Sequence, residues 1–462
     1  MISLTPQRVK KSAHARKRLQ TLLCALSFWC ALLDTFLAFP YHEQARGTYS
    51  MKFYSNSVRR SFRVKTGDAL WIAPATVFII MLSISAFTGF WPWTQNPYPS
   101  YALQAQSWLQ GRLDLGQDYP WLELAIYKGK YYVSFPPFPS YVLLPFAVFC
   151  GANTPDSLIA WVVTLMGVTT SVSLCRQLGA TPRSSIFWTL YLYLGTGYLF
   201  LGQTSWVWFF AQSMAFTLSL LSLKAALDNR GGWSLSFWAC AVGCRPLNVL
   251  YLPLLFYLLR QNEKQLPIPR WIFQHLLWAV GPCIIGGSYM LLNTLRFDNP
   301  LEFGHNYLPE FVRAAQGQFS LSYVPDHLKL LLRLPGIDPE SGMLIFEHLE
   351  TNAFFLICPF SISFLIAWGY GMIHRTSGDL PLLLGLPLLA VCHVLLICMH
   401  RTLGGFQFGN RYFVDLMPFL LLGLLSWKNP NARFDAFQTP LFALGTCLNL
   451  LGTVMTYRTW GS

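Results

Sequence analysis

The segment WLELAIYKGKYYVSFPPFPSYVLLPFAVF, residues 121–149, decides how the chain is laid out. It begins with one glutamate and two lysines among aromatic residues, and it ends in a proline-containing apolar run, residues 138–149. Crossing a membrane requires about 20 consecutive apolar residues, so this run is too short to do so. We therefore predict a juxtamembrane helix that lies on the outer face of the membrane.

The composition is that of a membrane protein. Hydrophobic residues make up 53% of the 462 residues, charged residues only 11%, and the mean hydropathy is +0.39. Soluble domains carry about 25% charged residues. Recurrent long apolar runs predict an all-α polytopic membrane protein. We assign the net charge of +13 to cytoplasmic loops and to lipid headgroups, and we expect no nucleic-acid partner.

Basic residues in the short loops orient the helices. Arg59 to Lys65 precede the first span, so that side is predicted to be cytoplasmic. The loop with Arg176 and Arg183 is cytoplasmic as well only if residues 138–149 do not cross. The sequence predicts about nine full spans, which are 69–90, 157–175, 185–202, 207–227, 271–292, 352–373, 380–399, 411–427 and 437–455.

Residues 233–260, WSLSFWACAVGCRPLNVLYLPLLFYLLR, form a second unusual segment. As one span, it would place Arg245 near the middle of the membrane, at a cost of about 2.5–3.5 kcal/mol. Pro246 favours an extended residue before it. We therefore predict a hairpin of two half-helices with Arg245 at its tip, reachable from outside.

These assignments divide the chain into three parts. Residues 1–68 are a basic N-terminal extension whose apolar stretch, 20–39, is either an interfacial or a signal-like segment, unless translation starts at Met51. Residues 69–455 form the transmembrane domain, with outer loops 91–156 and 293–351, and residues 456–462 are a tail. Most acidic residues fall in the two outer loops, which predicts a site on the outer side.

Charged residues in the first outer loop are candidates for chemistry. A carboxylate at Asp114, Asp118 or Glu123 could serve as a general base or bind a divalent cation. The alternative for each acid is a solvated loop with local ion pairs. Tyr131 and Tyr132 could stack on a sugar or simply line the membrane interface.

Arginines in three further places could bind a phosphate. Arg245 at the hairpin tip is the first, with a structural ion pair as the alternative. Arg296, near His305 in the second outer loop, belongs to a predicted substrate-binding group. Arg401 and Arg411 lie in a glycine-rich stretch where both could fork onto phosphate oxygens. An i,i+4 ion pair between Arg411 and Asp415 is the alternative there.

The chain resembles the GT-C superfamily of polytopic glycosyltransferases, which includes protein O-mannosyltransferases and the aminoarabinose transferase. The resemblance covers most of residues 69–455. It is carried by LQAQSWLQGRLDL, LAIYKGKYYVSFPPFPSYVLLPF, GCRPLNVLYLPLL, LRFDNPLEFGHNY and GGFQFGNRYFVDLMPFLLL. It implies a polyprenyl- or dolichyl-phosphate sugar donor, a glycan, lipid or protein acceptor, and transfer with inversion on the extracytoplasmic face. In many members a divalent cation, Mg or Mn, assists.

The resemblance also assigns roles to residues. Well-known members carry an acid soon after the first span, where this chain has Gln95 and Asn96. We therefore expect the base to be Glu123, with Asp118 as second choice and Asp114 as third. The resemblance implies that Arg245 meets the donor phosphate, and we expect Arg411 and Arg401 to bind it as well.

Two other functions are compatible with the sequence. One is a transporter or flippase of a lipid-linked or anionic substrate, and the other is a catalytically silent scaffold with the transferase fold. The expected location is the bacterial plasma membrane, or the endoplasmic reticulum in a eukaryote.

Overall fold

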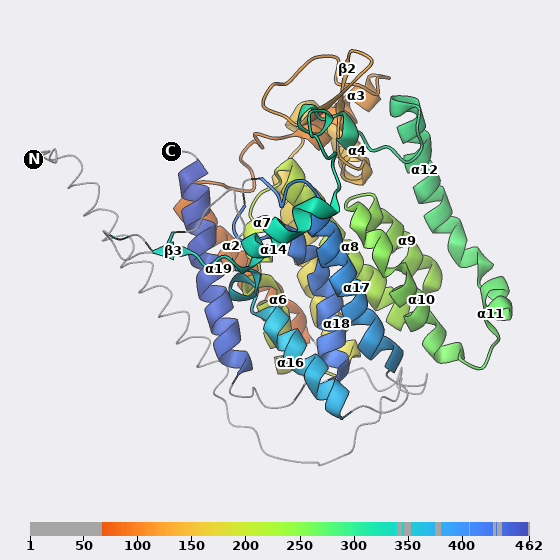
Figure 1. The fold of residues 1–462 in the computed structure, drawn as a ribbon, viewed down its shortest axis with the longest axis vertical. Coiled ribbons are helices and arrows are strands. Elements are labelled where there is room, and N and C mark those ends of the chain that lie inside the picture. Colours follow the sequence, from red (N-terminus) through yellow and green to blue (C-terminus); the bar gives the residue numbers. More distant parts are fainter. Residues whose placement is uncertain are drawn as a thin grey trace, which may run out of the picture. The chain divides into compact units, whose positions relative to one another are not determined.

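The computed structural model describes residues 67–460 except 338, 340–343, 346–352, 375–379, 406, 428–430 and 432–436. The predicted N-terminal extension, the Met51 start and most of the C-terminal tail therefore lie outside the described residues. Helices dominate the described part of the chain (Figure 1). This agrees with the predicted class, a predominantly helical, integral membrane protein.

Among the described residues, six helical stretches are long and apolar enough to cross a membrane. They contain α2 (Gly67–Thr88), α5 (Asp156–Gln177), α8 (Val207–Leu227), α12 (Val280–Phe297), α17 (Leu380–Met399) and α19 (Gln438–Trp460). A 3₁₀ turn, η5 (Leu276–Ala279), leads into α12. Helix α8 packs against α5 and α9 (Gly231–Val242) and is almost entirely buried, whereas α12 has little of its surface buried. Of the six long helical stretches, α8 is therefore the one most buried inside the bundle.

The remaining three predicted full spans appear as shorter or interrupted helices. The 185–202 span divides into α6 (Pro182–Leu194) and α7 (Tyr198–Leu201). The 352–373 span divides into α15 (Phe354–Ile357) and α16 (Phe360–Ile373), with Pro359 at the junction. The 411–427 span begins as a 3₁₀ helix, η8 (Arg411–Leu416), and continues as α18 (Met417–Trp427). The described residues thus hold six long spans where the apolar runs predicted nine.

The predicted hairpin is confirmed. Helix α9 ends at Val242, and the chain continues through η3 (Pro246–Tyr251) into α10 (Leu252–Arg260), which packs back on α9 (Figure 1). Arg245 has extended backbone angles, φ −139° and ψ 103°, as expected for a residue that precedes proline. The Trp238 indole donates to the Asn248 carbonyl (2.9 Å) and holds the two arms together. The proline therefore breaks the helix where the arginine would otherwise enter the membrane.

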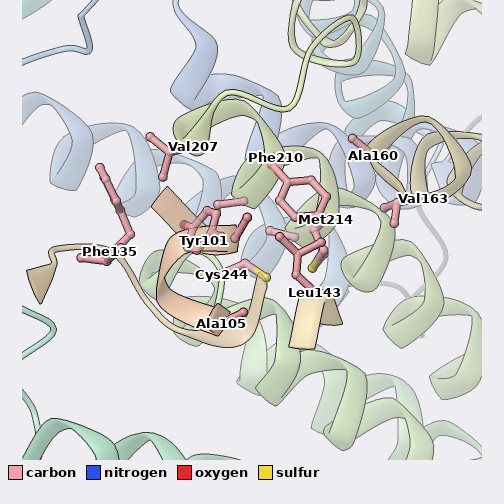
Figure 2. Packing of buried hydrophobic residues seen from close by; sticks show 14 of the residues in the cluster. Tyr101, Ala105, Phe135, Leu143, Ala160, Val163, Val207, Phe210, Met214 and Cys244 are labelled. Carbon is pink, nitrogen blue, oxygen red and sulfur yellow. The ribbon is translucent and has the colours of Figure 1, made fainter. Parts of the chain in front are cut away.

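The first outer loop contains α3 (Ser100–Leu109), α4 (Phe138–Cys150) and η2 (Gly151–Asn153). Helix α4 has 13 residues, which confirms a short helix at 138–149. The Phe138 amide donates to the Gly243 carbonyl (3.0 Å), so α4 begins beside the hairpin tip. Apolar residues from α3, α4, α5 and α8 form one buried cluster under this loop, labelled in Figure 2.

The same loop contains a strand pair that the sequence analysis did not predict. Strand β1 (Leu124–Tyr127) pairs antiparallel with β2 (Lys130–Val133). Lys128 and Gly129 form the two-residue turn, and both have positive φ, 49° and 74°. Positive φ at both central positions is typical of a type I′ turn, which favours glycine and joins strands tightly. The sequence analysis had assigned this part of the loop no secondary structure.

The second outer loop is made of short elements. These are η6 (His305–Tyr307), α13 (Pro309–Val312), η7 (Leu321–Tyr323), α14 (Val324–Leu332), β3 (Gly336–Ile337) and β4 (Leu344–Ile345). The loop attaches to the end of α17, because the Ser320 amide donates to the Met399 carbonyl (2.8 Å) and the Arg401 amide donates to the Gln318 carbonyl (2.8 Å). On the other side of the bundle, η4 (Gln261–Glu263) and α11 (Ile268–Gln274) connect α10 to η5.

The packing of α9 on the segment before α12 can be tested with two adjacent glycines. A Cβ atom at Gly231 would lie 2.0 Å from the Trp278 ring, whereas one at Gly232 would lie 3.8 Å from it. We expect Gly231→Ala to destabilise the protein by about 1–3 kcal/mol, because the added methyl group would overlap the Trp278 ring. Gly232→Ala should leave stability nearly unchanged. Thermal unfolding in detergent or nanodiscs measures both, and equal midpoints would contradict this packing.

Candidate functional site

The tip of the hairpin meets η8 through an ion pair. Arg245 Nε donates to Asp415 Oδ2 at 3.0 Å, and the Arg245 guanidinium lies over the Tyr412 ring, 4.8 Å from its centroid. Asp415 is buried, while the Arg245 side chain keeps about a fifth of its surface exposed, 21%. The guanidinium is therefore oriented by the protein and still partly accessible.

Arg411 lies beside this pair and is more deeply buried. Its backbone is fixed at both ends: the amide donates to Gln407 Oε1 (3.1 Å), and the carbonyl accepts from Gln212 Nε2 (2.6 Å). Its guanidinium lies 5.9 Å from the Trp208 ring, 5.6 Å from the Phe209 ring and 4.9 Å from the Tyr412 ring. Arg411 Nε and Nη1 have no hydrogen-bond partner among the described residues. A buried guanidinium with donors unused is an unusual and costly arrangement, and it suits an anionic ligand.

The alternative i,i+4 ion pair between Arg411 and Asp415 does not form. Asp415 pairs with Arg245 and also accepts from Gln212 Nε2 (3.0 Å). Both Arg411 and Asp415 belong to η8, a 3₁₀ helix. In a 3₁₀ helix the residues that share a face are three apart, so positions four apart point in different directions.

Glu123 reaches the same place from the first outer loop. It immediately precedes β1, and its Oε2 accepts a hydrogen bond from Trp208 Nε1 (3.0 Å). The carboxyl opens to solvent on one side, yet the surrounding protein restricts its hydration, and this burial raises its pKa. The Trp208 hydrogen bond and the charge of Arg411 act in the opposite direction on that pKa. Glu123 and Arg411 are thus electrostatic neighbours, and both lie close to the Trp208 side chain.

The second outer loop contributes Glu310 and His305 to this surface. His305 Nδ1 donates to the Ser134 carbonyl (2.9 Å), and burial lowers the pKa of His305, so the neutral imidazole is favoured. Burial raises the pKa of Glu310, and the charge of Glu123 acts in the same direction. Arg401 donates to the Glu310 main-chain carbonyl, so it braces this loop instead of joining Arg245 and Arg411.

The other predicted site residues have different surroundings. Asp118 is exposed, and Asp114 forms an ion pair with Lys130 (3.7 Å). Tyr131 is half-buried against the cluster under the first outer loop. Tyr132 is buried with its ring 5.2 Å from that of Phe297, so it is no exposed platform for a sugar.

Arg296 is buried and joins α12 to the strand pair. It donates to the Val133 carbonyl (3.2 Å) and to Asn293 Oδ1 (2.9 Å). This is a bracing role, and the structure shows no contact between Arg296 and the arginines near Asp415.

A buried acid that the sequence analysis overlooked connects the first outer loop to the bundle. Asp156, the first residue of α5, accepts hydrogen bonds from Asn96 Nδ2 (2.7 Å) and Ser205 Oγ (3.0 Å). Asn96 Nδ2 also donates to the Ser205 carbonyl (2.8 Å). Asn96, one of the two amides found where the resemblance implies an acid, therefore fixes the first outer loop to the bundle. Asp156 could have been noticed in the sequence, because it directly follows Pro155 at the predicted start of a helix, where an acidic residue is favourable.

The residues near the arginines do not fit a metal centre. Among the described residues, no group of three or more His, Cys, Asp or Glu side chains comes together in a way that could hold a metal ion. Divalent cations in proteins take several oxygen ligands. Besides the two arginines, the acidic side chains assembled here are Glu123, Glu310 and Asp415, and Asp415 already accepts hydrogen bonds from Arg245 and Gln212.

Solved structures with a similar fold exist, although no protein-family model and no curated protein matches this chain. The crystal structure of ArnT from Cupriavidus metallidurans bound to undecaprenyl phosphate aligns with a TM-score of 0.50 and 14% identity over 86% of this chain and 77% of that one. The fold is similar to that of ArnT. This confirms the predicted resemblance to GT-C glycosyltransferases at the level of the fold.

A second ArnT structure from the same organism, in the apo state, aligns with a TM-score of 0.46 and 13% identity. It covers 82% of this chain and 76% of that one.

The role of Asn96 can be tested against its exposed neighbour. Asn96→Asp would replace a donor 2.7 Å from the Asp156 carboxylate by a second acid. We expect a loss of about 1–3 kcal/mol of stability, because a buried acceptor loses its partner and faces a like charge. Gln95→Glu, which alters an exposed amide next to it, should be nearly neutral. Thermal unfolding at neutral pH compares the two, and a stable Asn96→Asp variant would contradict the assigned contact.

Proposed function

We propose that this protein is a membrane glycosyltransferase that moves a sugar from a polyprenyl- or dolichyl-phosphate donor to an acceptor on the extracytoplasmic face. The observation that carries the proposal is the convergence of Arg245, Arg411 and Glu123 from three distant segments. Arg411 presents two nitrogen atoms without a partner among the described residues. The ArnT structure that shares the fold is bound to undecaprenyl phosphate, and a lipid phosphate supplies the anion that these donors suit.

The proposed reaction follows from the placement of charge. The donor phosphate lies against Arg245 and Arg411, which stabilise the negative charge that grows on it as the bond to the anomeric carbon breaks. Glu123 takes the proton of the acceptor hydroxyl or amine while the acceptor oxygen or nitrogen attacks that carbon from the opposite face. The products are an inverted glycoside and the polyprenyl phosphate. No step is assigned to a metal ion, because the donor set described above does not fit one.

The polar side chains around Glu123 favour sugar transfer over transport as the function. They combine a carboxylate with a raised pKa, the Trp208 indole donor and the charge of Arg411, and groups with perturbed pKa values concentrate at catalytic sites. We propose that acceptor and donor meet here. The acceptor is a glycan, a lipid or a protein, and the location is the bacterial plasma membrane or, in a eukaryote, the endoplasmic reticulum.

Substitutions separate donor binding from chemistry. In nanodiscs, Arg245→Ala or Arg411→Ala should weaken binding of undecaprenyl phosphate about ten-fold or more, since each removes a charge-assisted contact. Glu123→Gln should keep that binding and lower transfer by about 100-fold or more, because the base is lost. Release of polyprenyl phosphate from a panel of radiolabelled donors measures transfer.

Asp118→Asn is the control for the base, because Asp118 is an exposed acid of the same loop. If Asp118→Asn abolished sugar transfer while Glu123→Gln retained it, Asp118 would be the general base. Saturable binding without release from any donor would favour the flippase or the silent scaffold. If the wild-type protein bound no undecaprenyl phosphate at any concentration tested, the proposed donor class would be refuted.

The pH profile tests the surroundings of Glu123. The Trp208 hydrogen bond stabilises the carboxylate and lowers its pKa, so Trp208→Phe should raise that pKa. Since the base acts as a carboxylate, the acid side of the rate profile should move to higher pH. Trp121→Phe, at an exposed tryptophan of the same loop, should leave it in place. If the acid side of the rate profile stayed in place in Trp208→Phe, a group other than Glu123 would determine it.

A further inference from the structure

We propose that Gln212 and Asp415 are positioning residues that fix both arginines of the candidate site from the interior of the bundle. The inference rests on the proposed function, because it assumes that Arg245 and Arg411 bind the phosphate of the donor. It adds to that function two residues that would not touch the donor. Their effect would pass through the orientation of the two guanidinium groups.

Asp415 selects which edge of Arg245 is available. Its Oδ2 accepts from Arg245 Nε at 3.0 Å, and the structure gives the two Nη nitrogens no hydrogen bond to the described residues. The Tyr412 ring supports the face of the guanidinium, 4.8 Å from its centroid. A guanidinium held at Nε and on one face keeps its outer edge for a ligand. Forked binding of a phosphate requires such a fixed plane.

Gln212 holds Asp415 and Arg411 at the same time. Its Nε2 donates to Asp415 Oδ1 (3.0 Å) and to the Arg411 carbonyl (2.6 Å). Both partners are acceptors, so only the amide nitrogen can face them and the orientation of the amide is determined. Gln212 is fully buried in α8, the most buried of the six long helical stretches. One buried side chain of α8 therefore holds Arg411 directly and Arg245 through Asp415.

This network has features that stability alone does not require. Replacing a buried ion pair by apolar residues of similar volume is often neutral or stabilising. Here the protein instead places a fully buried amide and a buried carboxylate behind an arginine that is partly exposed. Residues that lock the rotamer of a ligand-binding group from behind are a general requirement for a precise site.

A double-mutant cycle tests the inference. Asp415→Asn keeps the shape and removes the charge that holds Arg245 Nε, so it should weaken binding of undecaprenyl phosphate about ten-fold in the wild-type background. Because Asp415 acts through Arg245, the same substitution should change binding less than two-fold in an Arg245→Ala background. Gln212→Met should weaken binding in both backgrounds, because it also releases the Arg411 carbonyl. Binding to the purified protein in nanodiscs is measured by titration with undecaprenyl phosphate.

Thr217→Val is the matched control. Thr217 is equally buried in α8, but its hydroxyl donates to the Val163 carbonyl of α5 (3.1 Å), away from the arginines. It should leave undecaprenyl phosphate binding unchanged. Equal losses for Asp415→Asn in both backgrounds, or a Thr217→Val loss as large as that of Gln212→Met, would show a merely structural role and overturn the inference. Failure of the wild-type protein to bind would instead refute the proposed function, and the inference with it.

Discussion

The contact between Arg245 and Asp415 is the interaction on which the arrangement of this site depends. A charged guanidinium at the tip of a short membrane hairpin needs a partner, and an unpaired buried carboxylate on η8 would be equally unfavourable. Pairing the two joins segments 170 residues apart in the chain at a distance of 3.0 Å. The hairpin, η8 and α8 then share one polar contact, and the aromatic rings around Arg411 are assembled beside it.

The elements that are determined locally were predictable from the sequence. A break at Arg245 follows from Pro246, and a short helix at 138–149 follows from the length of its apolar run. The strand pair at 124–133 was missed because each strand has only four residues, and its signal is the backbone requirement of the Lys128–Gly129 turn. The sequence analysis predicted more full spans than the described residues contain, because mean hydropathy does not register a helix interruption such as the one at Pro359.

The pairing of charges could not be predicted in the same way. The i,i+4 rule assumes an α-helix, whereas Arg411 and Asp415 lie on a 3₁₀ helix, and nothing local indicates that Arg245 is the partner of Asp415. Asn96 likewise looked like a missing acid, and only the folded chain shows it bound to Asp156. Glu123 and Arg411 were both named from the sequence, but Trp208, which lies close to both, was not.

The attachment of the strand pair to α12 has a mechanical consequence. Arg296 grips the Val133 carbonyl, Asp298 bonds to Lys128 (2.6 Å) and to the Tyr127 hydroxyl (2.8 Å), and the Ser134 hydroxyl donates to the Glu123 carbonyl (3.0 Å). Helix α12 contacts the protein mainly through α9 and presents most of its surface outward, where a membrane helix meets acyl chains. These bonds connect α12 to the strand pair that begins directly after Glu123, so a change in the tilt of α12 would be expected to move the backbone beside that carboxylate.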